Sequence, residues 1–166
     1  MTGATAYKAA LLESAARYVA LGWQVFICGN DKKPLQQGGF KNASTDLSRS
    51  DRVLIRHPDG MLAVRTGSES GIVVIDPDVD AAKGIDGRDW LIEAQRKGMP
   101  DCPIAETPRG GLHLYFAHPG RKIQNSVGPS PGPRLLRWFQ VDRRRWSSKP
   151  PSGLARNTWR RLRQRE

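Results

Sequence analysis

The sequence predicts an α+β domain in which helices and strands are mixed and neighbouring strands run antiparallel. Two observations predict this class. Short apolar runs bounded by turn residues occur among stretches whose apolar side chains recur at helical spacing. Several of these runs are joined by turns too short for a crossover helix, which favours antiparallel pairs over a Rossmann-type sheet. A length of 166 residues is typical of one domain with its own core.

The first elements are expected to be two helices with a buried strand between them. A helix over residues 4–20 ends at Gly22, and the strand follows over residues 23–28. The second helix begins near Ser48 and ends before Pro58, because proline disfavours helical geometry in the preceding residue. The apolar residues expected to face inward are Ala9, Leu12, Ala16, Val19 and Ala20 on the first helix and Val53, Leu54 and Ile55 on the second.

The next elements are expected to be two strand pairs separated by a helix. Strands over residues 61–66 and 71–76 follow one another in hairpin-like succession around a Gly-Ser-Glu-Ser-Gly turn. A helix over residues 86–97 precedes strands over residues 104–107 and 112–117, which enclose the turn Pro-Arg-Gly-Gly. The third helix is expected to turn Trp90, Leu91 and Ala94 inward and to end at Gly98.

The positive charge is concentrated near the C-terminus. Residues 1–130 carry 16 Lys and Arg against 14 Asp and Glu, whereas residues 131–166 carry 11 against 2, with three of the five tryptophans. We therefore expect a folded domain over residues 1–130 and an Arg-rich tail over residues 131–166. Two interpretations of the tail stay open. It is an arm that lies along phosphates and stacks on bases, or part of it is no native core segment, since a GC-rich gene read out of frame gives this composition.

Several protein classes are not supported by the sequence. Apolar runs fall well short of the roughly 18 residues that span a bilayer, and Lys8, Glu13 and Arg17 interrupt any signal-peptide core, so a cytoplasmic protein without a membrane partner is expected. Cys28 and Cys102 lack a CxxC or Cys/His neighbourhood, which predicts small buried side chains and no zinc site. The sequence contains neither GxxxxGK nor a GxGxxG after a strand, so a P-loop motor or a dinucleotide enzyme is not indicated.

Carboxylates spaced by two follow the apolar run that ends at Ile75. Alternate side chains of a strand share a face, so Asp76 and Asp78 can converge on one cation, and Asp80 can join them. Two such carboxylates repel each other unless a cation or a basic side chain lies between them. Oxygen ligands favour Mg²⁺ or Mn²⁺ over zinc. The alternative is a polar turn after a strand, since Asp and Pro are common in turns for their own reasons.

His113 is the second candidate, because it alternates with Leu112 and Leu114 and therefore faces away from both. A lone strand histidine is more often structural than catalytic. Here Arg109, Gly110 and Gly111 precede it. The two glycines let a ligand approach the backbone closely, beside a cationic side chain and an imidazole, and this combination suits phosphate oxygens. His57 and His118 lack such a context and are expected at the surface.

These pieces, in this order, resemble the N-terminal primase-polymerase domain of bifunctional DNA primase/polymerases, a branch of the archaeo-eukaryotic primase superfamily found in plasmids, phages and prophages. The similarity covers residues 7–130. The pieces that carry it are Ala16 with the segment 18–26, Lys33-Pro34, the segment 39–46, the segment 63–67 with Ser70-Gly71, the segment 73–78, and Thr107 with the segment 110–116.

The resemblance implies metal-dependent, template-directed nucleotidyl transfer on a sheet of the RNA-recognition-motif type. Asp76 and Asp78 correspond to the acidic metal-binding motif, and His113 to the histidine that contacts the triphosphate of the incoming nucleotide. Two Mg²⁺ or Mn²⁺ ions would activate the primer hydroxyl and stabilise the leaving pyrophosphate. The implied partners are a DNA template, nucleoside triphosphates and a replicative helicase supplied separately; no zinc and no organic cofactor is implied.

The sequence departs from the family at its third motif. Members continue with a further aspartate, an Arg-Gly and Gly-Gly strand, and Pro-Pro-Ser. Here Asp142 could be the third metal-binding acid, and Pro150-Pro151-Ser152 matches in kind, but the glycines between them are missing and the spacing is short. The three basic residues Arg143, Arg144 and Arg145 are instead candidates for nucleic-acid binding.

Three functions stay open at this point. The first is an active DNA primase/polymerase domain that serves the replication of a plasmid, phage or prophage. The second is a catalytically inactive, truncated remnant that binds nucleic acid through its Arg-rich tail. The third is a metal-dependent nuclease or phosphatase, which would share the aspartates but would not need the nucleotide-binding residues 110–113.

Overall fold

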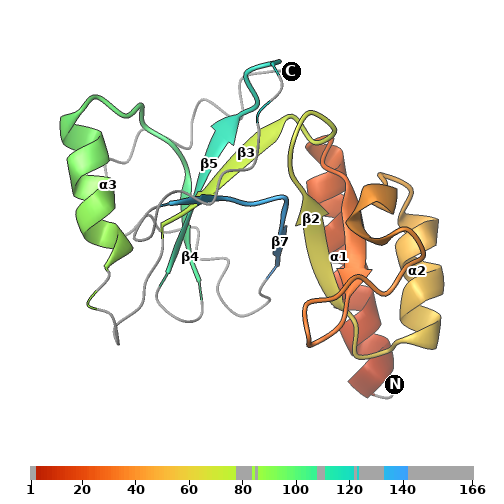
Figure 1. The fold of residues 1–166 in the computed structure, drawn as a ribbon. Helices are drawn as coiled ribbons and strands as arrows, with labels where there is room; N and C mark the ends of the chain where they lie inside the picture. The colour runs from red at the N-terminus through yellow and green to blue at the C-terminus, as the bar shows by residue number, and fades with distance from the viewer. Residues whose placement is uncertain are drawn as a thin grey trace. The chain divides into compact units, whose positions relative to one another are not determined.

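The computed structural model describes residues 3–77, 84, 86–107, 111–121, 123 and 133–141 (Figure 1). The chain divides into two compact units. The first unit holds Met1–Ile72, His118–Gly120 and Arg137–Val141. The second holds Val73–Ala117, Arg121–Leu136 and Asp142–Glu166, the last of which lies outside the described residues. The fold class is α+β, as predicted, with helices and antiparallel strand pairs in the described part of the chain.

The first unit is built around a three-stranded antiparallel sheet in the order β1-β2-β7. Strand β1 (Val25–Cys28) pairs with β2 (Met61–Arg65), which pairs on its other edge with β7 (Trp138–Gln140). All four side chains of β1 are buried, as expected for a continuous apolar run covered on both faces. Helices α1 (Gly3–Ala20) and α2 (Leu47–Arg56) pack with these strands and with each other, and a short 3₁₀ helix, η1 (Gly39–Asn42), precedes α2.

The buried face of α1 differs from the prediction. Leu11, Ala15 and Tyr18 are buried, whereas Ala9, Ala16 and Ala20 are exposed and Leu12 and Val19 are only half-buried. The spacing of four and three residues places the buried set on one stripe. An alanine-rich helix has several stripes of similar polarity, and the stripe with the large Leu11 and Tyr18 side chains buries the most apolar area. The Tyr18 ring stacks on Trp23 with 5.7 Å between ring centroids.

Helix α2 begins and ends close to the predicted positions. The Asp46 carboxylate caps it by accepting a hydrogen bond from the Ser48 backbone N–H at 3.0 Å. Val53 and Leu54 are buried, as predicted, but the Ile55 side chain is 61% exposed. Successive helical residues turn by about 100°, so three consecutive side chains cannot all face one core.

The second unit contains a four-stranded sheet in the order β4-β5-β3-β6. Strand β4 (Ile104–Glu106) pairs antiparallel with β5 (Leu112–Ala117), which confirms the predicted pair, and β3 (Ile72–Asp76) pairs antiparallel with β6 (Arg134–Leu135). Helix α3 (Gly87–Arg96) lies beside this sheet (Figure 1). The core cluster of this unit consists of the buried residues Leu91, Ile104, Leu112 and Leu114, with Ile75, Trp90, Met99, Cys102 and Phe116 packed against it.

The predicted hairpin between residues 61–66 and 71–76 is wrong. Strands β2 and β3 belong to different sheets, and only an isolated bridge between Gly67 and Ile72 joins their ends. Both edges of β2 are already occupied, by β1 and by β7, so no edge is left for β3. The turn sequence was a correct signal for a change of direction, but it did not show which strands pair.

Within the described residues, no helix is both long enough and apolar enough to cross a bilayer. Cys28 is buried, as predicted, while Cys102 is only half-buried. His57 and His118 are also half-buried. The strands β6 and β7 both come from the segment 131–166, whose remaining residues from 142 onward lie outside the described part of the chain.

Candidate active site on one face of the β3–β5 sheet

Asp76 is the last residue of β3 and is half-buried. Its neighbour Ile75 packs against the core cluster that contains Leu112, Leu114 and Leu91 of α3. Successive strand side chains point to opposite faces of a sheet. Asp76 therefore lies on the face away from this cluster, together with Val74.

His113 lies on the same face as Asp76. Its two neighbours, Leu112 and Leu114, are both buried in the core cluster, so His113 points the other way. Strands β5 and β3 are neighbours in the sheet. The structure thus brings Asp76 and His113 to adjacent strands and to one side of the sheet, which is the arrangement that a shared site requires.

Tyr115 extends this face along β5. It lies two residues after His113, and the two rings are in edge-on contact with 6.4 Å between their centroids. The Tyr115 side chain is buried, with 8% of its surface exposed, while His113 is half-buried. On the other side of His113, Ala105 of β4 lies directly opposite in the antiparallel pair. A small residue at that position leaves room beside the imidazole.

Arg134 is a member of this face that the sequence analysis did not single out. In the antiparallel pair of β3 and β6, Asp76 lies opposite Arg134 and Ile75 lies opposite Leu135. Directly opposed residues have Cβ atoms about 4.5–5.5 Å apart and side chains on the same face. Arg134 is exposed and brings a positive charge next to the carboxylate. The sequence carried no signal for it, because Arg134 is one of many arginines in the basic segment and β6 has only two residues.

The chain extends its pairing with β3 one residue past Leu135. The Leu136 backbone N–H donates a hydrogen bond to the Val74 carbonyl at 3.0 Å, which places Leu136 opposite Val74 and on the face of Asp76. The strand that borders β3 therefore presents Arg134 and Leu136 to this face. Residues 133–141 contain no Asp or Glu, so this strand adds no further carboxylate next to Asp76.

Close packing fixes the backbone that follows Asp76. Pro77 is buried, and a Cβ added to Gly87 at the start of α3 would lie 2.6 Å from the Pro77 Cβ and 2.9 Å from its carbonyl carbon. Real Cβ atoms do not approach this closely. The Asp86 carboxylate caps α3 by accepting a hydrogen bond from the Arg88 backbone N–H at 2.9 Å. The absence of a side chain at Gly87 thus allows α3 to begin directly against the residue after Asp76.

The predicted nucleotide-binding loop is described only at its last residue. The Thr107 backbone N–H donates to the Gly111 carbonyl at 2.7 Å, which closes the β4–β5 connection. A Cβ at Gly111 would lie 3.0 Å from Thr107 Oγ1, so this position is tight. The other predicted site residues, namely Asp78, Arg109, Gly110, Asp142, Arg143, Arg144 and Arg145, lie outside the described residues.

The described residues alone do not form a complete metal site. They contain no group of three or more His, Cys, Asp or Glu side chains arranged to hold an ion. Of the three predicted metal ligands, Asp76 is the one that the structure describes. A carboxylate oxygen at a strand end suits Mg²⁺ or Mn²⁺ better than zinc, which prefers nitrogen and sulfur. Asp76, Asp78 and Asp142 all remain predictions as ligands.

The two thiols are poor candidates for nucleophilic chemistry. Burial raises the pKa of Cys28 and that of Cys102 to about 11 each, from an ordinary value of 9.0. Both thiols are therefore protonated at neutral pH, and a protonated thiol is a weak nucleophile and a weak metal ligand. We therefore expect the candidate site to use oxygen and nitrogen groups.

Comparison with known proteins identifies the family to which the chain belongs. A family model described as the N-terminal domain of bifunctional DNA primase/polymerases matches residues 15–164. The matched range contains Asp76, His113 and Arg134 and continues into the segment after residue 141. A search of curated proteins gave no match.

Proposed function

Because this chain belongs to the family of bifunctional DNA primase/polymerase N-terminal domains, we propose that it joins nucleotides on a DNA template in a divalent-cation-dependent nucleotidyl transfer. The placement of Asp76 and His113 on one face of adjacent strands supports this proposal. Nucleotidyl transfer needs a carboxylate-bound cation and a cationic or hydrogen-bonding group for the triphosphate within one site.

We assign cation binding to Asp76, with Asp78 and Asp142 as the predicted further ligands. When bound, Mg²⁺ or Mn²⁺ supplies positive charge to the reacting phosphate and lowers the pKa of the attacking hydroxyl. Asp76 stands at the end of a central strand, and tight packing of Pro77 against Gly87 holds the backbone behind it. A ligand on such a rigid element keeps its position, which nucleotidyl transfer requires because it depends mainly on positioning and electrostatics.

We assign contact with the triphosphate to His113 and Arg134. An imidazole N–H donates a hydrogen bond to a phosphate oxygen, and a guanidinium group can donate two in parallel. Arg134 is opposite Asp76, and His113 is on the strand on the other side of β3. The nucleotide phosphates would therefore lie across the end of β3, where their negative charge meets basic groups from both neighbouring strands. Gly111, together with Arg109 and Gly110, is the predicted backbone approach to these phosphates.

Incorporation of nucleotides by the purified full chain tests this function. A primed single-stranded DNA template, Mn²⁺ or Mg²⁺, and deoxynucleoside or ribonucleoside triphosphates are supplied, and extension of the labelled primer is followed. We expect extension by the wild type, a loss of at least a hundredfold in Asp76→Asn, and little change in Asp101→Asn, which neutralises an exposed carboxylate outside the site.

The same assay separates the three functions suggested by the sequence. A nuclease would shorten the labelled strand and would not need triphosphates. A phosphatase would release phosphate from the triphosphates without extending the primer, and an inactive remnant would change neither the strand nor the triphosphates. Any of these results with the wild type would overturn the proposed nucleotidyl transfer.

A further inference from the structure

We propose that α2 carries a second nucleic-acid contact, in which Arg49, Arg52 and Arg56 bind successive phosphates of a single strand. We call these three residues the α2 arginine row. They recur at spacings of three and four residues, which places them along one side of the helix. All three are exposed. The row lies in the first unit, and the inference concerns binding alone, so it does not depend on catalysis in the second unit.

The α2 arginine row is not neutralised by nearby acids. Among the ion pairs between described residues, none includes a guanidinium group of this row. Asp51 of the same helix is paired with Lys8 at 2.9 Å. Asp46 is engaged at the helix cap, and hydrogen bonds from Ser48 are the main cause that lowers its pKa, with smaller contributions from the charges of Arg52 and Arg49. Arg52 makes one neutral contact, a hydrogen bond to Ser48 Oγ at 3.1 Å.

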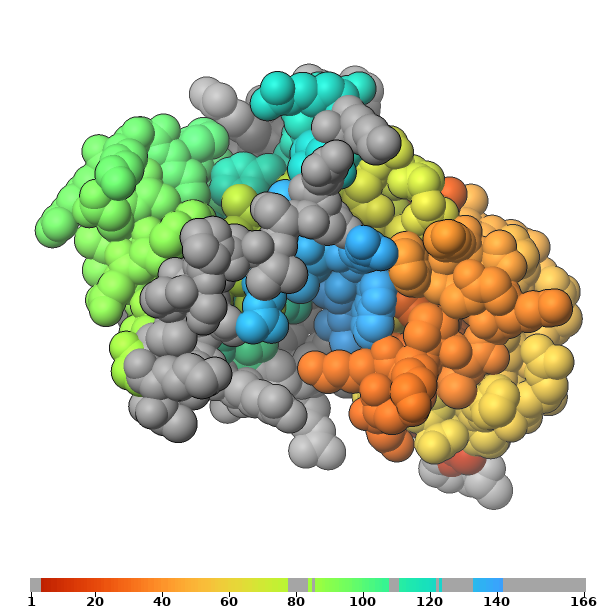
Figure 2. Space-filling view, viewed as in Figure 1, coloured from red at the N-terminus to blue at the C-terminus, as the bar shows by residue number. Residues whose placement is uncertain are grey.

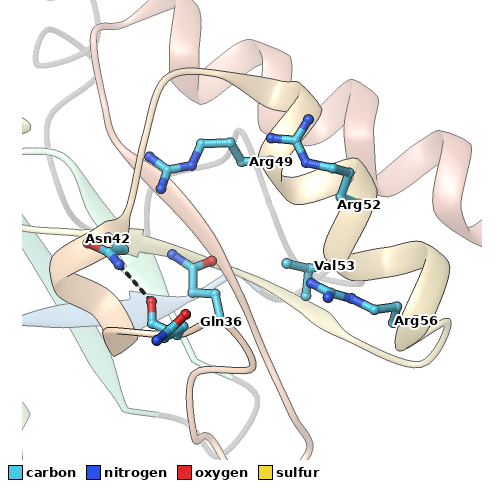
Figure 3. A pocket seen from close by; sticks show the side chains of 7 residues that line it. Gln36, Asn42, Arg49, Arg52, Val53 and Arg56 are labelled. Carbon is cyan, nitrogen blue, oxygen red and sulfur yellow. Dashed lines mark hydrogen bonds between the residues drawn. The ribbon is translucent and has the colours of Figure 1, made fainter.

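A polar pocket of about 220 Å³ lies beside the row. Its walls combine the three arginines with amide side chains of the segment before η1 and of η1 itself, and Val53 forms an apolar part of its floor (Figure 3). Figure 3 shows Arg49 and Arg56 reaching toward the side on which Gln36 and Asn42 lie. The lining residues are Gln36, Gln37, Asn42, Arg49, Arg52, Val53 and Arg56.

Hydrogen bonds hold part of the pocket wall in place. The Asn42 amide nitrogen donates to the Gln37 carbonyl at 2.7 Å, which leaves its Oδ1 as an acceptor on the wall. The Gln36 amide makes a long contact of 3.5 Å to the Gly39 carbonyl. Figure 2 shows α2 and the segment before it, in orange and yellow, as a continuous part of the molecular surface.

The dimensions of the pocket and the row fit a polynucleotide better than a free small molecule. Pockets for drug-sized ligands measure about 300–1,000 Å³, so this pocket suits one group of a longer ligand. From Arg49 to Arg56 the helix rises by about 10 Å. That length corresponds to about three nucleotides at the 3.4 Å spacing of a stacked strand.

The chemistry favours a single strand over a duplex. Guanidinium groups bind phosphates through paired hydrogen bonds, and Asn and Gln side chains donate to and accept from sugars, phosphates and base edges. A pocket with amide walls next to a phosphate-binding row can receive a base turned out of the strand. In a duplex the bases are stacked and paired inside, so they are not offered to such a pocket.

Fluorescence anisotropy with the full chain and a labelled oligothymidylate tests the proposal. The titrations contain EDTA and no triphosphate, so that cation and nucleotide binding at Asp76 do not contribute. The test variant is Arg49→Gln/Arg52→Gln/Arg56→Gln. The matched control is Arg88→Gln/Arg96→Gln/Lys97→Gln, which removes the same charge from exposed positions of α3 and of its C-terminal cap. Circular dichroism checks that both variants fold.

We expect the test variant to bind the oligonucleotide at least tenfold more weakly than the control at the same salt concentration. The slope of log affinity against log salt should fall by about 2, since each phosphate contact on a single strand contributes about 0.7. The triple Arg→Lys variant should retain most of the slope, because lysine keeps the charge. A duplex of the same length should discriminate less between the two glutamine variants.

Three results would overturn the proposal. Equal losses in the two glutamine variants would show a general charge effect. Unchanged strand binding in the test variant, combined with lost binding of a labelled nucleoside triphosphate in a separate titration, would assign the pocket to the nucleotide. An unchanged affinity for both ligands would indicate that the row binds a different partner, such as an acidic protein surface.

Discussion

Asp76 and Arg134 lie directly opposite each other in the antiparallel pair of β3 and β6. The pair places a carboxylate and a guanidinium group side by side on the face that also carries His113. A carboxylate next to a basic side chain can stay ionised without a bound cation. This relationship connects the predicted acidic motif to a strand formed by the basic C-terminal segment, and it carries the first prediction.

Arg134→Ala should weaken nucleotide binding more than it slows the chemical step. The guanidinium group is expected to contact the triphosphate, so its loss should raise the KM for the triphosphate about tenfold, or by about 1.4 kcal/mol in binding free energy. Steady-state primer extension over a range of triphosphate concentrations measures KM and kcat separately. Arg96→Ala, at an exposed position of α3, is the control and should change neither. A fall in kcat with unchanged KM would contradict the assigned role.

His113→Ala should also reduce triphosphate affinity, while His118→Ala should not. Both side chains are half-buried, but only His113 lies on the face of Asp76. His113→Gln keeps a hydrogen-bond donor and should recover part of the loss. Equilibrium binding of a non-hydrolysable triphosphate analogue in the presence of Mg²⁺ measures the effect. Equal affinities of His113→Ala and wild type would show that the imidazole does not contact the nucleotide.

Leu136→Asp should strengthen cation binding if the third acid is missing from this face. Leu136 is opposite Val74 and shares the face of Asp76, so an aspartate there would add a carboxylate to that face. Mn²⁺ affinity, followed by electron paramagnetic resonance, should rise severalfold. If Asp142 already serves as the third ligand, Asp142→Ala will weaken Mn²⁺ binding and Leu136→Asp will add little. The two variants together therefore decide whether Asp142 completes the site.

Gly87→Ala should destabilise the second unit by about 1–3 kcal/mol. An alanine in a helix normally stabilises a protein relative to glycine. Here the added Cβ would lie 2.6 Å from the Pro77 Cβ, so α3 or the end of β3 must move. Urea unfolding followed by circular dichroism gives the free energy of unfolding, and Arg88→Ala at the next, exposed position is the control. A more stable Gly87→Ala variant would contradict the close packing behind Asp76.

The free energy of unfolding should fall as the pH rises above about 9. Burial raises the pKa of the Cys28 and Cys102 thiols to about 11, from 9.0 in the unfolded chain. Between these values the unfolded state has released its thiol protons while the folded state keeps them, so rising pH favours unfolding. Burial also raises the pKa of the Tyr18 phenol, which acts in the same direction. The variant Cys28→Ala/Cys102→Ala should show a shallower fall in urea titrations between pH 8 and pH 11. An identical slope would contradict the assigned cause.

The elements of the fold could largely be predicted from local patterns. The proline after α2 and the glycine after α3 mark helix ends through interactions between near neighbours, and the structure has these ends within one or two residues. Pairing between strands could not be predicted in the same way. The hairpin between β2 and β3 was predicted wrongly, because β2 pairs with β1 and with the distant β7. This pairing depends on the packing of the whole unit.

The residues of the candidate site also differ in whether local sequence patterns predict them. The acidic pair and the alternation around His113 are local signals, and the shared face of Asp76 and His113 follows once β3 and β5 are known to be neighbours. Arg134 and Leu136 reach that face only through a two-residue strand and one further backbone hydrogen bond. The composition of the surrounding segment, rich in arginine, gives no hint of this register. Likewise, no local pattern distinguished the inner stripe of α1 from its other alanine-rich stripes.

The central claim is that Asp76 holds a divalent cation beside the imidazole that receives the nucleotide. Nuclear magnetic resonance of the full chain with labelled histidines tests it most directly, because His57, His113 and His118 are its only histidines. When Mn²⁺ is added with a nucleoside triphosphate, the claim predicts paramagnetic broadening of the His113 ring signals and loss of this broadening in Asp76→Asn. A His113 signal that stays sharp in the wild type under saturating Mn²⁺ and nucleotide would contradict it.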